Sequence, residues 1–340
     1  MSSIRLLFSD SYDPWFNLAA ENYIFHNMPK YQCILFLWRN CDTVVIGRAQ
    51  NPWKECNTRR MDRDGVRLAR RSSGGGAVFH DLGNTCFTFM SSKSKFFDHD
   101  DNFSTKIVLD ALHRVNIDAF VCGRNDILVK TNYGNRKISG SAYRRTNCGK
   151  FHHGTLLLHT DLNKLVYYLT PDEKKLQSKG ITSIRSRVVN LIQIKPNINH
   201  EMLCQSLKES FFNACDQEVI SEIISPKIFS DDFEFLKLFL KQSSWKWNFG
   251  LAPDFSHELN TRFDWGGVSF FFDIENGTIV RSCMFTDSLY PDPLEELSFR
   301  LINVPYNPKN IRFCCKQWMK RWLEYPELTE ISKWLEQCVS

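Results

Sequence analysis

The most informative segment of the sequence is Arg70-Arg71-Ser72-Ser73-Gly74-Gly75-Gly76-Ala77-Val78-Phe79-His80-Asp81. Three successive glycines cost backbone entropy inside a helix or strand, so they indicate a segment whose backbone must approach another group closely. The N–H groups of such a segment can bind phosphate or carboxylate oxygens, and the neighbouring arginine pair suits an anion. The run matches neither Gly-x-x-x-x-Gly-Lys-Ser/Thr nor Gly-x-Gly-x-x-Gly. From the residues alone, an anion site and a glycine-rich connecting turn are both open.

Three further stretches carry candidate site residues. The run Lys137-Ile138-Ser139-Gly140-Ser141-Ala142 is typical either of a strand that presents one ammonium group to a narrow cleft or of plain surface. His152 and His153 are adjacent, and adjacent strand residues point to opposite faces, which favours core or hydrogen-bonding roles over a shared metal. Asp126 precedes a strand, where its carboxylate would either hold the Mg²⁺ that accompanies ATP or open a turn.

Apolar, β-branched runs predict the strands, and apolar residues at helical spacing predict the helices. Strands are expected at residues 33–38 and 43–46, around a tight turn, and at 86–90, 127–129, 137–142 and 155–159. Helices are expected at 162–169, 201–215 and 231–242, and from a capping Ser104 to about Arg114.

The pattern of residue types along the sequence changes near residues 245–250, which indicates a domain boundary. Beyond this point, residues 267–273 and 278–285 flank Glu275-Asn276-Gly277, a good hairpin turn because Asn-Gly accepts positive φ. Helical patterns follow at 293–302 and over most of 310–338. The expected fold class is α+β, with mixed sheets flanked by helices. We expect a large domain over residues 1–246 and a small α+β domain over residues 253–340.

Composition and charge exclude several classes of protein. Forty-three Lys and Arg against 38 Asp and Glu give a net charge of +5, without the blocks of charge typical of nucleic-acid binders. The 12 cysteines form no Cys-x-x-Cys pair, and a chain this long needs no disulfide scaffold, so we expect reduced thiols. We find no signal core and no apolar run of about 20 residues, so a cytoplasmic protein that binds no membrane is expected.

Taken together, these stretches form a recognisable pattern. The runs RRSSGGGAVFHD, RNDILVK, RKISGSA, FHHGTLLL and KGITSIRSRVVNL occur in this order and at the spacing found in bacterial lipoate–protein ligase A. The chain resembles this family from about residue 4 to residue 293, and more weakly beyond. The resemblance implies a catalytic domain shared with biotin–protein ligases, with its core at about residues 30–216, followed by a small C-terminal accessory domain.

The resemblance also implies roles for individual residues. It places Arg71 and Gly76-Ala77-Val78-Phe79 on the nucleotide, and it makes Lys137 the catalytic residue that contacts both the activated carboxyl group and the phosphate. Arg185 belongs to a loop that folds over the adenylate. Lipoate would lie against Lys137, Ser73, Gly75 and His153, and Asp126 is the candidate Mg²⁺ ligand.

The activity implied is the formation of lipoyl-AMP from lipoate and ATP, followed by transfer of the lipoyl group to a lysine. The implied carriers are the lipoyl domains of 2-oxoacid dehydrogenase complexes and the glycine cleavage H protein. ATP and Mg²⁺ are expected as co-substrate and ion, with no tightly bound cofactor, no nucleic-acid partner and a monomeric state.

Three other functions compete with this interpretation. A lipoyltransferase that uses preformed lipoyl-AMP keeps much of the same pocket, but the absence of a targeting segment favours the complete ligase. A biotin ligase fits the glycine and lysine stretches less well. A nucleic-acid or scaffold protein would leave the glycine run and Lys137 without a purpose.

Overall fold

The computed structural model describes residues 3–92, 102–123, 125–147, 149–169, 188–249, 257–275, 277–325 and 328–339. The chain forms two compact units. The large unit comprises Met1–Ile46, Pro52–Ser72 and Ala77–Asn248, and the C-terminal unit comprises Gly47–Asn51, Ser73–Gly76 and Phe249–Ser340. This division differs from the predicted domains at two short segments, which lie early in the sequence and pack with the C-terminal unit. Within the described residues, no helix is both long and apolar enough to cross a membrane.

An eight-stranded sheet forms the centre of the large unit, with the order β11-β1-β2-β6-β10-β9-β8-β7. β1 pairs in parallel with β2 and β11, and the other neighbouring strands pair antiparallel. The strands are β1 (Ser3–Ser9), β2 (Gln32–Trp38), β6 (Asn84–Ser92), β7 (Ala119–Cys122), β8 (Asp126–Thr131), β9 (Gly134–Thr146), β10 (Gly149–Leu157) and β11 (Ser221–Ile224).

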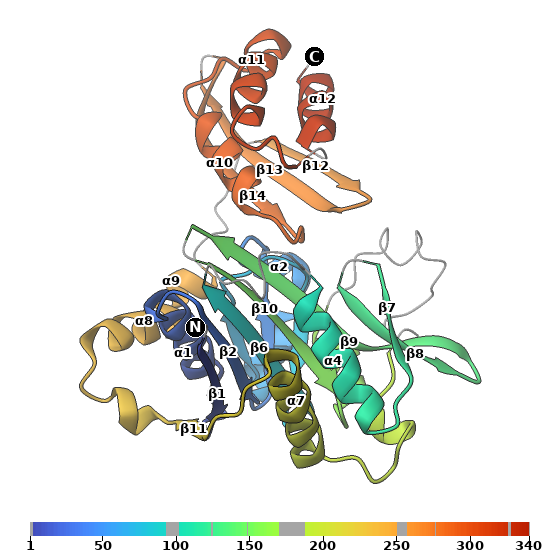
Figure 1. Ribbon diagram of the computed structural model, residues 1–340. Coiled ribbons are helices and arrows are strands. Elements are labelled where there is room, and N and C mark those ends of the chain that lie inside the picture. The colour runs from blue at the N-terminus through green and yellow to red at the C-terminus, as the bar shows by residue number, and fades with distance from the viewer. Residues whose placement is uncertain are drawn as a thin grey trace. The chain divides into compact units, whose positions relative to one another are not determined.

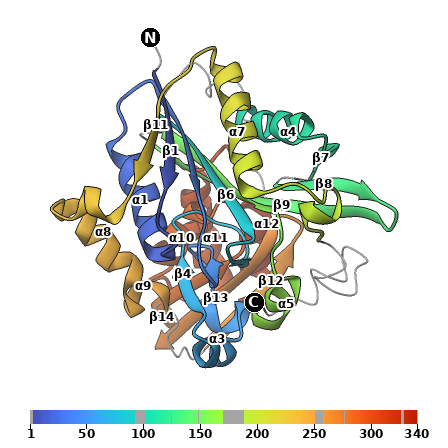
Figure 2. The same cartoon turned by 90° about the horizontal axis from the view of Figure 1, so that it is seen from below.

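Helices cover both faces of this sheet (Figures 1 and 2). α4 (Phe103–Arg114) and α7 (His200–Cys215) pack on one face, and α1 (Pro14–Asn27) packs on the other, with α8 (Phe233–Ser243) against α1. Because β2 and β6 lie between the two layers, all of their residues are buried. This burial explains why β2 has a continuous apolar run rather than the alternation typical of a half-exposed strand.

A second, three-stranded sheet has the order β4-β3-β5, from β3 (Thr43–Ile46), β4 (Arg67–Arg70) and β5 (Val78–His80). β3 pairs in parallel with β4 and antiparallel with β5. The predicted pairing of residues 33–38 with 43–46 around a tight turn is therefore wrong, because the two strands belong to different sheets. The remaining helices of the large unit are α2 (Pro52–Glu55), α3 (Thr58–Asp64), α5 (Leu162–Tyr168) and α9 (Trp245–Asn248), with short 3₁₀ turns at Leu191–Gln193 and Pro226–Phe229.

The predicted cap of the helix at residues 104–114 is also wrong. The helix begins at Phe103, and its N-cap residue, Asn102, makes no side-chain capping hydrogen bond. The Ser104 hydroxyl instead forms a 2.7 Å hydrogen bond with Nδ1 of His152 on β10. The Ser104 side chain, which the local sequence predicted to cap the helix, therefore makes a tertiary contact instead.

The C-terminal unit contains one antiparallel sheet, β12 (His257–Phe263), β13 (Gly266–Glu275) and β14 (Thr278–Thr286). Three helices, α10 (Asp292–Arg300), α11 (Pro308–Met319) and α12 (Leu328–Cys338), cover one face of it (Figure 1). Burial alternates along β13, so that Phe270 and Phe272 join Trp318 in the core. The predicted hairpin and the small α+β fold are confirmed, although the helical pattern over 310–338 forms two helices.

Candidate active site

Lys137 lies on β9 next to the first residue of β8, Asp126. Its ammonium nitrogen Nζ is 2.6 Å from Oδ1 of Asp126. The two side chains are 25% and 14% exposed, so the ion pair is largely enclosed but open to a small ligand. The backbone of Lys137 is fixed as well, because its carbonyl oxygen accepts a 3.0 Å hydrogen bond from the N–H of Val189.

Asp126 was predicted either to hold Mg²⁺ or to open a turn. The structure places it at the start of β8, where its carboxylate has a cationic partner in Lys137. Across the described ranges, no three His, Cys, Asp or Glu side chains are grouped as a metal site. Magnesium commonly binds through one carboxylate and the phosphates of its substrate. The Asp126 carboxylate can supply one such ligand.

Arg71 is buried against the three-stranded sheet. Its N–H donates to the carbonyl oxygen of Ile46 at 3.0 Å, and its Nη1 donates to that of Val45 at 3.2 Å. Burial lowers the pKa of the guanidinium to about 10, and the charge of Glu21 opposes this shift. Arg71 therefore stays cationic at neutral pH, in surroundings where a cation binds an anion more strongly than in water.

The neighbouring arginine has a different role. Arg70 is fully buried, and its Nε and Nη2 each donate a 2.9 Å hydrogen bond, to the carbonyl oxygens of Trp247 and Asn248. Its backbone N–H donates to Oδ1 of Asn248 at 2.8 Å. Sequence analysis treated the two arginines as a pair of anion donors, but Arg70 connects β4 to α9.

His153 forms a buried polar cluster with Glu21 of α1. Nδ1 of the histidine is 2.7 Å from Oε1 of Glu21, which also accepts a 2.7 Å hydrogen bond from the hydroxyl of Thr88. Nε1 of Trp38 in turn donates to that hydroxyl at 3.1 Å. Sequence analysis missed Glu21 as a site residue, although a carboxylate within the apolar run of residues 14–27 was a usable signal.

The two adjacent histidines point to opposite faces of β10, as their spacing predicted. His152 stacks on Tyr143 with ring centroids 4.2 Å apart, whereas His153 contacts Glu21. Burial lowers the pKa of His152 to about 3. Burial, together with the positive charge of Arg71, also lowers the pKa of His80 to about 3. His80 and His152 are therefore neutral at neutral pH.

The glycine run belongs by its contacts to the C-terminal unit. The N–H of Gly75 donates to the Ser288 carbonyl oxygen at 2.8 Å, and the Ser73 carbonyl oxygen accepts from the N–H of Arg48 at 2.8 Å. A Cβ atom at Gly74 would lie 2.4 Å from the Ser288 carbonyl oxygen and 2.8 Å from that of Leu289. At Gly74, the backbone of the glycine run therefore closely approaches the backbone of Ser288 and Leu289.

The remaining residues that were predicted to contact the nucleotide differ in their solvent exposure. Gly76, Ala77 and Val78 are partly exposed, whereas the Phe79 side chain is buried, with its ring centroid 5.7 Å from that of Tyr168. Arg185 lies outside the residues that the structure describes.

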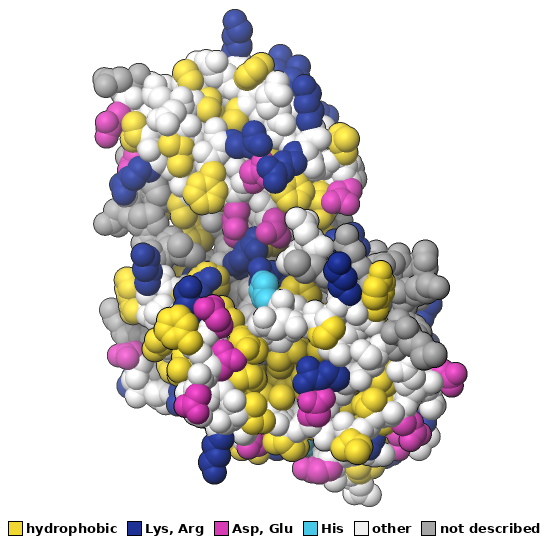
Figure 3. Space-filling view, turned by 60° about the vertical axis from the view of Figure 1, so that its left-hand side comes forward, with side chains coloured by type: hydrophobic (Ala, Val, Ile, Leu, Met, Phe, Trp, Pro, Cys, Tyr) yellow, Lys and Arg dark blue, Asp and Glu magenta, His cyan; other side chains and the backbone are white. Residues whose placement is uncertain are grey.

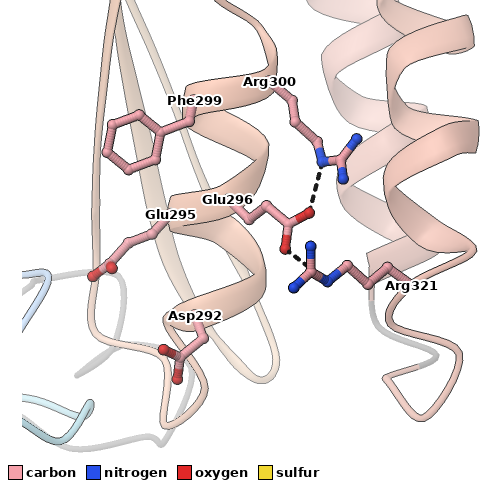
Figure 4. Close-up of a pocket in the computed structure, with 6 residues that line it drawn as sticks. All are labelled: Asp292, Glu295, Glu296, Phe299, Arg300 and Arg321. Atoms are coloured by element: carbon pink, nitrogen blue, oxygen red, sulfur yellow. Dashed lines mark hydrogen bonds and ion pairs between the residues drawn. The ribbon is translucent and has the colours of Figure 1, made fainter.

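A surface hollow in the C-terminal unit is lined by Asp292, Glu295, Glu296, Phe299, Arg300 and Arg321, none of them a predicted site residue (Figure 4). The carboxylates that line this hollow form ion pairs with arginines of the same unit. Glu296 forms ion pairs with Arg300 and Arg321, and the carboxylates of Asp292 and Glu295, which point away from this pair, both bind Arg48. On the face shown in Figure 3, Lys and Arg are interspersed with Asp and Glu, as the sequence pattern indicated.

Comparison with protein families assigns the class of enzyme. Residues 13–212 match the lipoyl protein ligase A/B catalytic domain, and residues 252–335 match the C-terminus of bacterial lipoate protein ligases. The candidate residues on β8, β9 and β10 all lie within the first match. The fold and the family match are therefore those of a lipoyl protein ligase.

Individual relatives define the family more narrowly. The chain is 60% identical to a lipoate-protein ligase A of Blochmanniella pennsylvanica, with all of both chains covered. It is 59% identical to one of Blochmanniella floridana, with 98% of both covered. Among solved structures, P. falciparum LipL1 in complex with lipoate has a TM-score of 0.82 at 32% identity, with 98% of this chain and 99% of that chain covered. A lipoate-protein ligase A bound with ATP has a TM-score of 0.62 at 25% identity, covering 74% of this chain and all of that one.

The chain belongs to the bacterial lipoate–protein ligase A family. Enzymes of this family are ATP-dependent ligases that activate lipoate and transfer it to lipoyl domains, and the match over the whole chain gives this protein the same activity.

Proposed function

We propose that this ligase performs both half-reactions around the ammonium group of Lys137. The observation that carries the proposal is the Lys137–Asp126 ion pair, which holds one cation in an enclosed position on the central sheet. Arg71, Gly76, Ala77, Val78, Phe79 and Arg185 would bind the adenylate, and Ser73, Gly75 and His153 would contact lipoate.

In the first half-reaction, a carboxylate oxygen of lipoate attacks the α-phosphorus of ATP, and pyrophosphate leaves. Negative charge builds up on the phosphoryl oxygens, where the Lys137 ammonium stabilises it because the group is already in place. A magnesium ion bound with ATP would neutralise charge on the departing pyrophosphate, and Asp126 is the candidate protein ligand.

In the second half-reaction, the neutral ε-amine of a carrier lysine attacks the carbonyl carbon of lipoyl-AMP. The amide bond forms, and AMP leaves with the bonding electron pair. Lys137 acts again, because it lies beside both the carbonyl oxygen and the phosphate in the proposed arrangement. Enclosure of the site limits attack by water on the anhydride.

Buried aromatic residues close to the polar cluster of His153 support lipoate as the acid. The ring of Phe151 lies 5.1 Å from that of His153, and Phe36 and Trp38 of β2 belong to the same buried cluster as Phe151. An apolar wall of this kind suits an alkyl chain and a dithiolane ring.

We further propose that the carriers are the lipoyl domains of 2-oxoacid dehydrogenase complexes and the glycine cleavage H protein, and that the enzyme acts in the cytoplasm as a monomer. One structural relative supports a lipoyl-domain partner. It is described as a bipartite lipoate protein ligase and its E2 lipoyl domain from Thermoplasma acidophilum, with a TM-score of 0.64 at 27% identity over 76% of this chain.

The test is lipoate-dependent exchange of labelled pyrophosphate into ATP, run with and without Mg²⁺. The expected result is exchange that requires lipoate and Mg²⁺ and that biotin does not support. Lack of exchange, with transfer intact from supplied lipoyl-AMP, would identify a lipoyltransferase and contradict the proposal.

A further inference from the structure

The position of Lys137 depends on an irregularity in the pairing of β8 with β9. Along this pair, Asp126 lies opposite Gly140 and Ile127 lies opposite Ser139, but Leu128 lies opposite Lys137. The register shifts between Ile127 and Leu128, so β9 contains one more residue than β8 at this point. A β-bulge of this type changes the direction of side chains on the longer strand.

The bulge decides which face of the sheet Lys137 occupies. In a regular strand, residues three positions apart point to opposite faces, so Lys137 and Gly140 would face away from each other. Directly opposite residues share a face, so Asp126 would face the same way as Gly140. The extra residue in β9 brings Lys137 to the same face of the sheet as Gly140 and Asp126. The Lys137 ammonium can therefore contact the Asp126 carboxylate.

Because Gly140 has no side chain, the end of the Lys137 side chain can lie next to its Cα atom. A Cβ atom at Gly140 would lie 2.8 Å from Nζ and 3.0 Å from Cε of Lys137. These are the last two atoms of a flexible side chain, so the lysine could move away from a methyl group while the backbone stayed in place. Any residue larger than glycine would thus displace the ammonium at small cost to stability.

We propose that Asp126 and Gly140 are positioning residues for Lys137: the carboxylate directs the ammonium, and the glycine leaves the space that it occupies. This inference rests on the proposed function of Lys137. It assigns Asp126 a role that does not depend on magnesium, and it explains the glycine within Lys137-Ile138-Ser139-Gly140-Ser141-Ala142. Positioning matters because a displacement of about 1 Å can cost on the order of 10²-fold in rate.

The two half-reactions separate positioning from metal binding. Adenylation uses ATP with Mg²⁺, whereas transfer from supplied lipoyl-AMP uses neither, and it can be measured in EDTA. If Asp126 acts through Lys137, its loss slows both half-reactions. If Asp126 acts only as a magnesium ligand, its loss slows adenylation alone, and a higher magnesium concentration restores the rate.

The experiment compares Asp126→Asn, Gly140→Ala and the double variant in the full-length enzyme. Asp118→Asn, whose side chain is 96% exposed, is the matched control for loss of a carboxylate. We expect both single variants to melt close to the wild-type temperature and to lose on the order of 10²-fold in turnover in both half-reactions. KM for ATP and for lipoate should change much less. Because both changes act on one ammonium group, the double variant should be about as slow as the slower single variant.

Three results would overturn the inference. These are normal transfer in EDTA by Asp126→Asn, recovery of its adenylation rate by excess Mg²⁺, or wild-type rates for Gly140→Ala. Failure of the proposed function is distinguishable, because the wild-type enzyme would then show no lipoate-dependent pyrophosphate exchange.

Discussion

The lysine motif at residues 137–142 and the glycine run at residues 74–76 both require glycine, but different groups require it. At Gly140, the space that a Cβ atom would fill belongs to the end of the Lys137 side chain. At Gly74, it belongs to backbone carbonyl groups of Ser288 and Leu289 within the C-terminal unit. A glycine in a sequence thus indicates a close approach, but it does not show whether the approaching group serves catalysis or folding.

The two arginines that precede the glycine run also differ in the groups that they contact. Both are buried, but Arg70 donates to the carbonyl groups of residues 247 and 248 in α9, whereas Arg71 donates to that of Val45 and its charge also interacts with Glu21. The consequences of substituting the two arginines should differ accordingly.

Replacing Lys137 should give the largest effect. Lys137→Ala removes the cation on which both half-reactions depend, and one preorganised donor of this kind is worth ~10²–10³-fold in rate. Lys137→Arg should also fail, because a planar guanidinium does not replace a compact ammonium in a confined space. Pyrophosphate exchange and lipoyl transfer measure the two steps, and Lys130→Ala, an exposed position on β8, is the control. Near-normal lipoylation by folded Lys137→Ala would show that the assigned role is wrong.

Replacing Arg70 should affect stability more than chemistry. Arg70→Met removes hydrogen bonds from a buried charged group to two carbonyl groups, and we expect a loss of about 3 kcal/mol in the free energy of unfolding. Urea unfolding measures the loss, and the fraction that stays folded should keep its KM for ATP. A large rise in that KM at unchanged stability would instead place Arg70 in the nucleotide site.

The smallest predicted effect concerns pH. The pKa of His152 falls from 6.5 to about 3 on burial, so the unfolded chain binds a proton that the folded chain does not. Stability from this residue is therefore complete above pH 6.5 and is lost as pH falls toward about 3. The loss is about 1.4 kcal/mol per pH unit within this window. Urea unfolding at pH 7 and pH 5 should show a smaller difference for His152→Asn than for the wild type, whereas equal differences would contradict the assignment.

Much of the fold followed from local pattern. Residues 33–38, 86–90 and 201–215 lie in strands or helices as predicted, because their apolar spacing matches the faces that they bury. The strand Ser3–Ser9 and the helix Pro14–Asn27 were not predicted. The helix is buried on most sides, so its sequence has no clear apolar and polar faces. The partner of β3 could not be predicted either, since pairing between distant strands leaves no local signal.

The candidate site could also be predicted only in part. Lys137 and Asp126 were both identified from sequence as candidates, yet their ion pair depends on a bulge, which no spacing rule indicates. The glycine run has a packing role at Gly74 that the sequence could not indicate, because Ser288 and Leu289 are distant in the chain. The roles of Ser73, Gly75 and Gly76 toward the substrates stay predictions.

The most direct test is a side-by-side measurement of Gly74→Ala and Gly140→Ala in two assays, thermal unfolding and lipoyl transfer per folded molecule. We expect one variant to lose mainly stability and the other to lose mainly turnover. Gly74→Ala should lower the melting temperature and keep most of the turnover of the folded enzyme, because its new methyl group meets backbone. Gly140→Ala should keep the melting temperature and lose turnover on the order of 10²-fold, because its new methyl group meets the catalytic ammonium. Parallel losses of stability and turnover in both variants would show that Gly74 and Gly140 do not have separate roles in folding and catalysis.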